Sequence, residues 1–256
     1  MLDEAWVTIS DFGYFGLLDV LLCSLHEFST RPVLVYSVHA AFDATPHPNV
    51  VDVRYVSENA HIWTLKMVKM IDAAPRARRL IFLDADTVVN HSIDEMWSTF
   101  DVQAAHPELP LLADNPARTN NPVVDRYRRY TGEEIGRPMG CTCLIWYTAA
   151  CVPFLVEACD FKRRMDSVVP GLGDEEAINV ILARRGSTQN VPFCTPLYHT
   201  VASYLRREPF ARANFGEAPE VYYHLFHGCK NAVEARALLA GIKSVRLPVH
   251  YARPGL

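Results

Sequence analysis

The chain has 256 residues, of which 50% are hydrophobic and 21% are charged, and its formal net charge is −4. This length suits one large α/β domain with a full core and is short for two domains. The acidic balance argues against a nucleic-acid partner, because proteins that bind nucleic acids usually carry a basic surplus.

Apolar runs and helical periodicity alternate along the first half of the chain. The expected elements are a strand at 5–10, a helix at 14–28, strands at 32–38 and 50–56, a helix at 60–73 and a strand at 79–86. This order predicts an open, mostly parallel sheet with helices packed on its faces. The unbroken apolar run at 80–83 indicates a central strand that is covered on both faces.

The second half of the chain is less regular. Residues 115–138 are polar and rich in Pro and Asn, which indicates an excursion or a flexible lid. The expected elements are strands at 109–114, 141–147 and 220–228, and helices at 149–164, from about Asp174 to a stop at Gly186, and at 231–241. Because neither an internal repeat nor a linker is evident, we expect a single domain.

The chain has seven cysteines and no CxxC pair. Most lie in apolar segments, so we expect reduced thiols that pack in the core, in a cytoplasmic or other reducing compartment. Their spacing argues against a zinc site, and Cys141 and Cys143 are expected on opposite faces of a strand. The acidic N-terminus does not resemble a secretory signal. The longest apolar stretch, residues 14–25, is too short to cross a bilayer, so we expect a soluble protein without a transmembrane segment.

Two aspartates, Asp84 and Asp86, follow directly after the apolar run "LIFL". Aspartates at a strand–helix junction are often simple caps. Here the pair lies at the carboxyl end of a buried strand, which is where open α/β sheets place their ligands. Two like charges this close are costly unless a cation or a proton shares the site. The position therefore favours a functional role.

Two chemistries fit this pair. In the first, the carboxylates hold Mg²⁺ or Mn²⁺, which also binds the oxygens of a diphosphate. In the second, a phosphohydrolase similar to the haloacid dehalogenases uses Asp84 as nucleophile and Asp86 as general acid. That class carries its motif on the first strand, whereas about eighty residues precede Asp84. It also needs a lysine before the acidic segment "GDEEA", and Lys162 lies in a run typical of a solvated helix end.

The order of the segments resembles the GT-A-fold glycosyltransferases, most closely the retaining glycogenin-like and bacterial galactosyltransferase-like group. The similar segments are "WVTISDFGYFGLLDVLLCSL", "WTLKMVKMIDAAPRARRLIFLDADTVV", "LLADNP", "GDEEAINVIL" and "YYHLFHGCKN". The resemblance implies an α/β, Rossmann-like domain with a mixed, mostly parallel sheet. Residues 1–114 would form its nucleotide-binding half and residues 115–256 its sugar and acceptor half.

The resemblance also implies metal-dependent transfer of a hexose or related sugar from a UDP-sugar to an acceptor hydroxyl, with retention of configuration. The acceptor would be a glycan, a protein or a small molecule. An inverting enzyme would instead need a carboxylate base, for which Asp174 and Glu175 are candidates.

The matched segments imply roles for individual side chains. Those near the uracil base would be Ser10, Asp11 and Tyr14. The ligands of Mn²⁺ or Mg²⁺ would be Asp84, Asp86 and one histidine, either His227 or His224. The diphosphate would meet Lys230 beside Gly228, and also Lys66, which could equally be a surface lysine of a helix. The sugar and the reaction centre would face Asp114, Thr142, Asp174 and Glu175. Because Cys141-Thr142-Cys143 replaces the family's Asn-Ser-Gly run, the resemblance does not identify the donor sugar.

Overall fold

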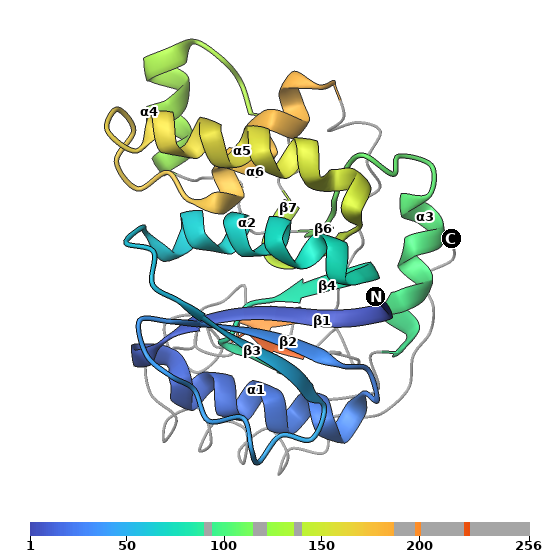
Figure 1. Ribbon diagram of the computed structural model, residues 1–256. Coiled ribbons are helices and arrows are strands. Elements are labelled where there is room, and N and C mark those ends of the chain that lie inside the picture. The colour runs from blue at the N-terminus through green and yellow to red at the C-terminus, as the bar shows by residue number, and fades with distance from the viewer. Residues whose placement is uncertain (90–93, 115–121, 136–139, 187–197, 201–222, 226–256) are drawn as a thin grey trace.

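A six-stranded sheet forms the centre of the computed structural model, which describes residues 1–89, 94–114, 122–135, 140–186, 198–200 and 223–225 (Figure 1). The strands are β1 (Leu2–Asp11), β2 (Val33–Val38), β3 (Val50–Val56), β4 (Ala77–Leu83), β6 (Leu111–Asp114) and β7 (Gly140–Tyr147). They lie in the order β3-β2-β1-β4-β7-β6. The strands from β3 to β4 run parallel, and β7 is antiparallel to both of its neighbours. The mixed, mostly parallel sheet predicted from the sequence is confirmed.

Helices cover both faces of this sheet. They are α1 (Phe15–Phe28), α2 (Ile62–Ala73), α3 (Phe100–Gln103), α4 (Pro122–Thr131), α5 (Val152–Met165) and α6 (Asp174–Arg184). Short 3₁₀ helices are η1 (Phe12–Tyr14), η2 (Ala74–Arg76), η3 (Asp94–Thr99) and η4 (Ala149–Cys151). Figure 1 shows α2, α5 and α6 together on one face and α1 on the other.

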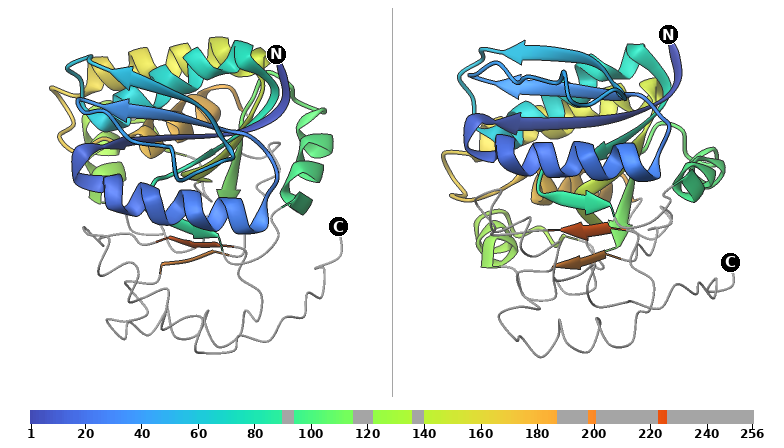
Figure 2. Two further views of the ribbon diagram at one scale, coloured as in Figure 1. Left: turned by 60° about the horizontal axis from the view of Figure 1, so that its bottom comes forward. Right: turned by 90° about the horizontal axis from the view of Figure 1, so that it is seen from below.

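A second, smaller sheet lies beside α1. Its strands are β5 (Thr87–Val89), β8 (Tyr198–Thr200) and β9 (Tyr223–Leu225), in the order β5-β9-β8 (Figure 2). Strand β5 follows the paired aspartates directly, and Val89 N donates a hydrogen bond of 3.0 Å to Ser24 Oγ on α1. This contact joins the segment after Asp86 to α1, the helix that covers one face of the main sheet.

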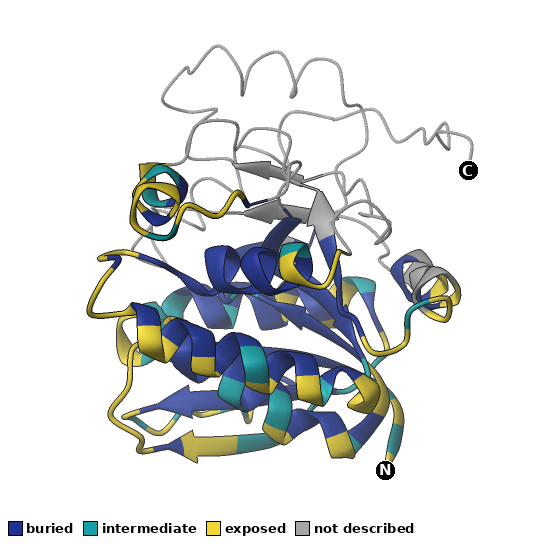
Figure 3. Ribbon diagram, turned by 90° about the horizontal axis from the view of Figure 1, so that it is seen from above, coloured by how far each residue is buried: buried dark blue, intermediate teal, exposed yellow. Residues whose placement is uncertain are grey.

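The centre of the main sheet is its most buried part, as the dark core in Figure 3 shows. All four residues of the run 80–83 on β4 are at most 1% exposed. On α1, Leu18, Leu22 and Leu25 face this core and are fully buried. The edge strand β3 is only partly buried. The interpretation of residues 80–83 as a central, doubly covered strand is therefore correct.

The structure corrects the expectation of an irregular excursion at 115–138 in part. Residues 122–131 form α4, which begins at Pro122, a residue well suited to the first turn of a helix. Val124 and Tyr127, three residues apart, are buried on its inner face. Arg126 donates a hydrogen bond of 2.8 Å to the carbonyl of Pro170. Helix α4 is thus packed against the turn that precedes α6.

Lys162 is not part of a solvated helix end. It is 2% exposed and forms an ion pair with Asp166, with its ammonium 5.8 Å from the centre of the Trp63 ring. Lys162 is covered because its side of α5 packs against α2, whereas its neighbours Arg163 and Arg164 are exposed. Charge composition does not reveal this tertiary effect.

The cysteines agree only partly with their prediction. Cys141, Cys143, Cys151 and Cys159 are buried thiols, but Cys23 is exposed. Cys141 and Cys143 lie on the same face of β7, with their sulfur atoms 2.9 Å apart. The expectation of opposite faces was wrong because residues i and i+2 of a strand share a face. Cys194 and Cys229 lie outside the described residues.

Within the described part of the chain, none of the helices has both the length and the apolar character needed to span a bilayer. The expected helix at 231–241 lies outside that part.

Candidate functional site

The topology of the main sheet brings several polar segments to one edge. Strands β1 and β4 are parallel and end at Asp11 and Leu83, and β7 starts at the same end because it is antiparallel to β4. Strand β6 ends at Asp114, paired with Gly140. We call this edge, marked by Asp11, Leu83, Asp114 and Gly140, the carboxyl edge.

The paired aspartates lie on this edge. The backbone N–H of Asp84 donates to the carbonyl of Cys143 at 3.0 Å, and the carbonyl of Asp84 accepts from Thr87 N at 3.1 Å. The chain therefore turns between β4 and β5, and both aspartates are partly buried. Burial, followed by the negative charge of Asp84, raises the pKa of Asp86 to about 7. A cation between the two carboxylates would remove this penalty, so the pair fits a hard divalent metal.

A buried lysine joins this pair to the rest of the site. The ammonium of Lys66, on α2, lies 2.8 Å from Asp84 Oδ1, 2.9 Å from Asp174 Oδ2 and 2.6 Å from the carbonyl oxygen of Thr142. A lysine has three N–H donors, so these acceptors engage all of them. Burial alone would lower the pKa of Lys66, but the carboxylates of Asp174 and Asp84 raise it overall. The alternative that Lys66 is a surface lysine is wrong, since only 5% of it is exposed.

Thr142 and Asp174 complete the network. The hydroxyl of Thr142 donates a 2.6 Å hydrogen bond to Asp174 Oδ2, the same oxygen that pairs with Lys66. Asp174 is the first residue of α6 and is 6% exposed. Four elements far apart in sequence thus place Lys66, Asp84, Thr142 and Asp174 in direct contact.

The first turn of α6 is acidic and buried. Glu175 and Glu176 are 8% and 4% exposed. Glu176 accepts a hydrogen bond of 2.8 Å from the backbone N–H of Gly173. This is one of the two bonds of a capping box, and glycine has no side chain to make the other. A Cβ at position 173 would lie 2.9 Å from Glu176 Oε2, so a side chain there would displace the Glu176 carboxylate. Negative charge is favourable at a helix N-terminus. Asp174 and Glu176 are also compensated by their hydrogen-bond partners.

Asn179 was missed in the sequence, although it stands in the segment "GDEEAIN". Its side-chain oxygen accepts from Gly140 N, and its amide nitrogen donates to the carbonyls of Gly140 and Glu175, all at 2.8 Å. The residue is fully buried. Asn179 therefore fixes the start of α6 against the start of β7. An uncharged amide amid acidic and apolar residues is the only sequence signal for this role.

The residues expected near a uracil base lie at the end of β1. Ser10 is buried and its hydroxyl donates to the carbonyl of Asp11 at 3.1 Å. Asp11 has an extended backbone and precedes η1, which contains the half-buried Tyr14. These residues share the carboxyl edge with Asp84, because β1 and β4 are adjacent and parallel.

The backbone of one candidate histidine lies beside the aspartates. His224, on β9, pairs with Val88, and Leu225 pairs with Thr87, the residue that follows Asp86. The other predicted ligand residues of this segment, His227, Gly228 and Lys230, lie outside the described residues. Asp114 ends β6 opposite Gly140.

Comparison with protein-family models and with curated proteins finds no match. Solved structures do match. A galactosyltransferase, LgtC, in complex with donor and acceptor sugar analogues has a TM-score of 0.61 and 14% identity, with 97% of this chain and 98% of that chain covered. Its active-site mutant Q189E matches with 13% identity and the same TM-score. Mouse xyloside xylosyltransferase 1, in its apo form, has a TM-score of 0.55 and 11% identity over 90% of this chain and 99% of that chain. The GT-A fold predicted from the sequence is confirmed.

Proposed function

We propose that this protein is a metal-dependent glycosyltransferase that moves a hexose or related sugar from a UDP-sugar to an acceptor hydroxyl. The observation that carries the proposal is the contact network of Lys66, Asp84, Thr142 and Asp174 at the carboxyl edge. It links the paired aspartates to the acidic start of α6 within a fold shared with solved sugar-transferring enzymes. Residues 1–114 would bind the nucleotide, and residues 115–256 would form the sugar and acceptor side.

The charges of the site support a divalent cation. Asp84, Asp86 and Asp174 are three carboxylates, and the Lys66 ammonium contacts two of them, Asp84 and Asp174. When all are ionised, these four side chains carry a net charge of −2, which one Mn²⁺ or Mg²⁺ would balance. Asp84, Asp86 and either His224 or His227 would hold that ion. When bound, it would neutralise charge on the departing diphosphate.

The protein's own residues would position the donor. Lys66 holds Asp84 and Asp174 at fixed places, and we propose that it acts mainly through these carboxylates, because its three donors are already engaged. Lys230, beside Gly228, is the residue we propose for direct contact with the diphosphate. Ser10, Asp11 and Tyr14 would border the base at the end of β1.

The sugar would meet the start of α6. Asp174, which accepts two bonds through Oδ2, suits the orientation of sugar hydroxyls. Glu175 and Asp114 would lie beside it and shield positive charge that develops at the anomeric carbon. The engagement of Asp174 by two donors favours retention over an inverting mechanism with Asp174 as base. NMR of the product would decide, since an inverted anomer contradicts the proposed stereochemistry.

The fold argues against the phosphohydrolase alternative. Asp84 follows the fourth strand in sequence, and the solved structures named above, which share the fold, are those of sugar-transferring enzymes. Lys162, the lysine that this alternative required, pairs with Asp166 on α5 and takes no part in the network around Asp84.

A donor screen tests the proposal. The protein is incubated with a panel of UDP- and GDP-sugars, with Mn²⁺ or with chelator, and released nucleoside diphosphate is measured. We expect metal-dependent release from a UDP-sugar and its loss in Asp86→Asn. Hydrolysis of a simple phosphate ester that disappears in Asp84→Asn, with no release from any nucleotide sugar, would support the phosphohydrolase instead.

A further inference from the structure

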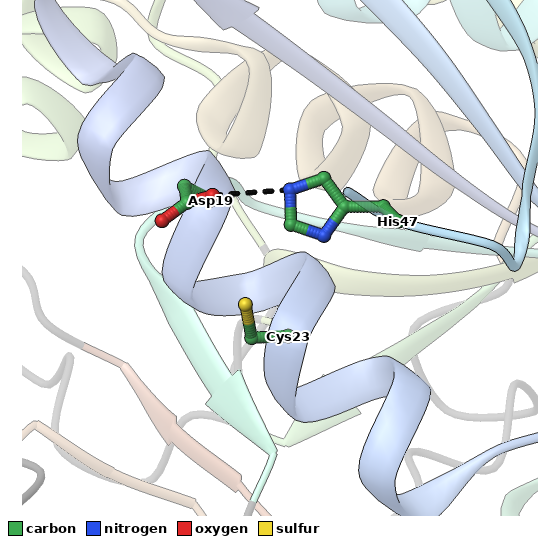
Figure 4. Close-up of side chains that lie close together, drawn as sticks. All are labelled: Asp19, Cys23 and His47. Atoms are coloured by element: carbon green, nitrogen blue, oxygen red, sulfur yellow. Dashed lines mark hydrogen bonds and ion pairs between the residues drawn. The ribbon is translucent and has the colours of Figure 1, made fainter. Parts of the chain in front are cut away.

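A second cluster of metal-binding side chains lies on the face of the main sheet opposite α2, α5 and α6. Asp19 and Cys23 stand on α1, and His47 comes from the loop between β2 and β3 (Figure 4). One ligand atom from each of the three lies within 4.8 Å of the other two. Nε2 of His47 lies 3.0 Å from Asp19 Oδ1.

We propose that Asp19, Cys23 and His47 bind a zinc ion, at a site separate from the paired aspartates. A thiolate, an imidazole and a carboxylate are the three kinds of side chain that zinc binds, at about 2.0–2.3 Å. Ligand atoms already within 4.8 Å of each other need only small side-chain movements to surround one ion. Three protein ligands leave a fourth tetrahedral position for water or another ligand.

Helical spacing explains two of the ligands. Asp19 and Cys23 are four residues apart on α1, so their side chains project from the same face, one turn apart. The neighbouring face, about 100° around the helix, carries Leu18, Leu22 and Leu25, which are buried. The burial of that leucine face therefore fixes which way the carboxylate and the thiol point.

The loop fixes the third ligand. His47 lies between Pro46 and Pro48, its N–H donates to the carbonyl of Ala44 at 2.8 Å, and its own carbonyl accepts from Val50 N at 3.0 Å. Its ring stacks on Phe42, with ring centres 6.0 Å apart and planes 13° from parallel. His47 is 3% exposed, whereas Cys23 is exposed. The imidazole of His47 is therefore held in place by its loop and by Phe42. The exposed thiol of Cys23 would let an ion reach the site from solvent.

The competing explanation is an ion pair between His47 and Asp19 that holds no metal. The role of Cys23 distinguishes this ion pair from a zinc site. The pair requires no thiol at position 23. A zinc site requires it, since a thiolate is the strongest ligand of the three. The spacing of the cysteines in the sequence argued against zinc because it considers ligands close in sequence, whereas the fold brings His47 to α1 from 24 residues beyond Cys23.

A zinc ion at this site would stabilise the segment that carries Tyr14, on one side of the proposed donor region. Phe42, which stacks on His47, also contacts Phe15 with ring centres 5.3 Å apart. Phe15 is the residue after Tyr14, which we place near the base. An ion that joins the loop to α1 would therefore restrict movement of the segment that carries Tyr14. The binding of zinc itself does not depend on the proposed transferase function.

The test uses the full-length chain without a histidine tag, in the Asp84→Asn/Asp86→Asn background, so that the paired aspartates do not bind the added metal. Zinc affinity is measured by competition with a chromophoric chelator, and Co²⁺ is added separately to record thiolate-to-metal charge-transfer absorption. We expect about one equivalent of zinc and a Co²⁺ thiolate band.

Three further variants are made in this background. Cys23→Ser, at an exposed position where folding is not at risk, should weaken zinc binding by at least about tenfold and abolish the Co²⁺ band. His47→Ala should weaken zinc binding similarly. His26→Ala, an exposed histidine on the same helix, should change neither. Absence of zinc binding in competition with the chelator, or an unchanged affinity and Co²⁺ spectrum in Cys23→Ser, would overturn the proposal even if His47→Ala fails to fold.

Discussion

The ammonium of Lys66 lies 2.8 Å from Oδ1 of Asp84, although the two residues are 18 positions apart in sequence. The same ammonium lies 2.9 Å from Asp174. One buried cation therefore stands between the aspartate pair that would hold a metal and the helix start that would face a sugar. This arrangement makes the geometry of both halves of the site depend on Lys66.

Replacement of Lys66 by methionine should destabilise the protein strongly. The change removes the charge but keeps much of the volume, so Asp84 and Asp174 lose their shared partner in a buried setting. Removal of one partner from a buried ion pair typically costs about 3–5 kcal/mol. Urea unfolding of the metal-free protein measures the loss.

Lys69→Met is the matched control for this change. Lys69 lies one turn away on α2 and is also buried, but its partner Glu58 is exposed, with a side-chain accessibility of 51%. An exposed carboxylate is well solvated without its partner, so the loss should be clearly smaller. Equal losses in the two variants would show that the network around Lys66 contributes nothing beyond ordinary packing.

Thr142→Val tests the link between β7 and α6. Valine has nearly the shape of threonine but removes the hydroxyl that donates to Asp174 at 2.6 Å. A hydrogen bond to a charged group contributes about 1.5–3 kcal/mol, so kcat/KM for the sugar donor should fall by roughly ten- to a hundredfold if Asp174 must be held in place. Steady-state kinetics with the donor found by the screen measure this.

Thr8→Val serves as the control. Thr8 is equally buried, on β1, but its hydroxyl has no hydrogen-bond partner within the described part of the structure. Its replacement should leave kcat/KM unchanged and should not destabilise the fold. If Thr142→Val behaves like Thr8→Val, the hydrogen bond to Asp174 has no functional role.

Asn179→Asp should lower the free energy of unfolding more than its small change in size suggests. The new carboxylate can still accept from Gly140 N, but it cannot donate to the carbonyls of Gly140 and Glu175. Two buried carbonyls lose a partner and a further negative charge enters an acidic helix start, so we expect a loss above about 2 kcal/mol in unfolding free energy. Chemical denaturation measures it, and a loss below that of an ordinary surface substitution would contradict the proposed role of Asn179.

The elements that can be predicted best from the sequence are those whose residue pattern depends on burial alone. The run 80–83 indicated the central strand because a strand covered on both faces must be apolar throughout. The resemblance to a known family singled out Lys66, Asp84, Thr142 and Asp174, which the structure brings into contact. Their mutual distances depend on strand order, which no local pattern contains.

Three of the features that the sequence did not reveal depend on contact between segments distant in sequence. Lys162 lies in a charged run, yet it is covered because Trp63 on α2 packs over it. Asn179 is an ordinary helix residue until its amide meets Gly140, 39 positions earlier. His47 reaches Asp19 across 28 positions, so their proximity was not foreseen. The misplacement of Cys141 and Cys143 on opposite faces has a different cause, a wrong strand period.

The binding of UDP with and without Mn²⁺, measured by calorimetry on the wild-type protein and on Asp86→Ala, tests the central claim most directly. If Asp84 and Asp86 hold a metal that carries the diphosphate, Mn²⁺ should raise the affinity of the wild type for UDP by at least about tenfold. Asp86→Ala should lose this enhancement while its metal-free affinity stays unchanged. Equal affinity of the wild type for UDP in Mn²⁺ and in chelator would contradict the account.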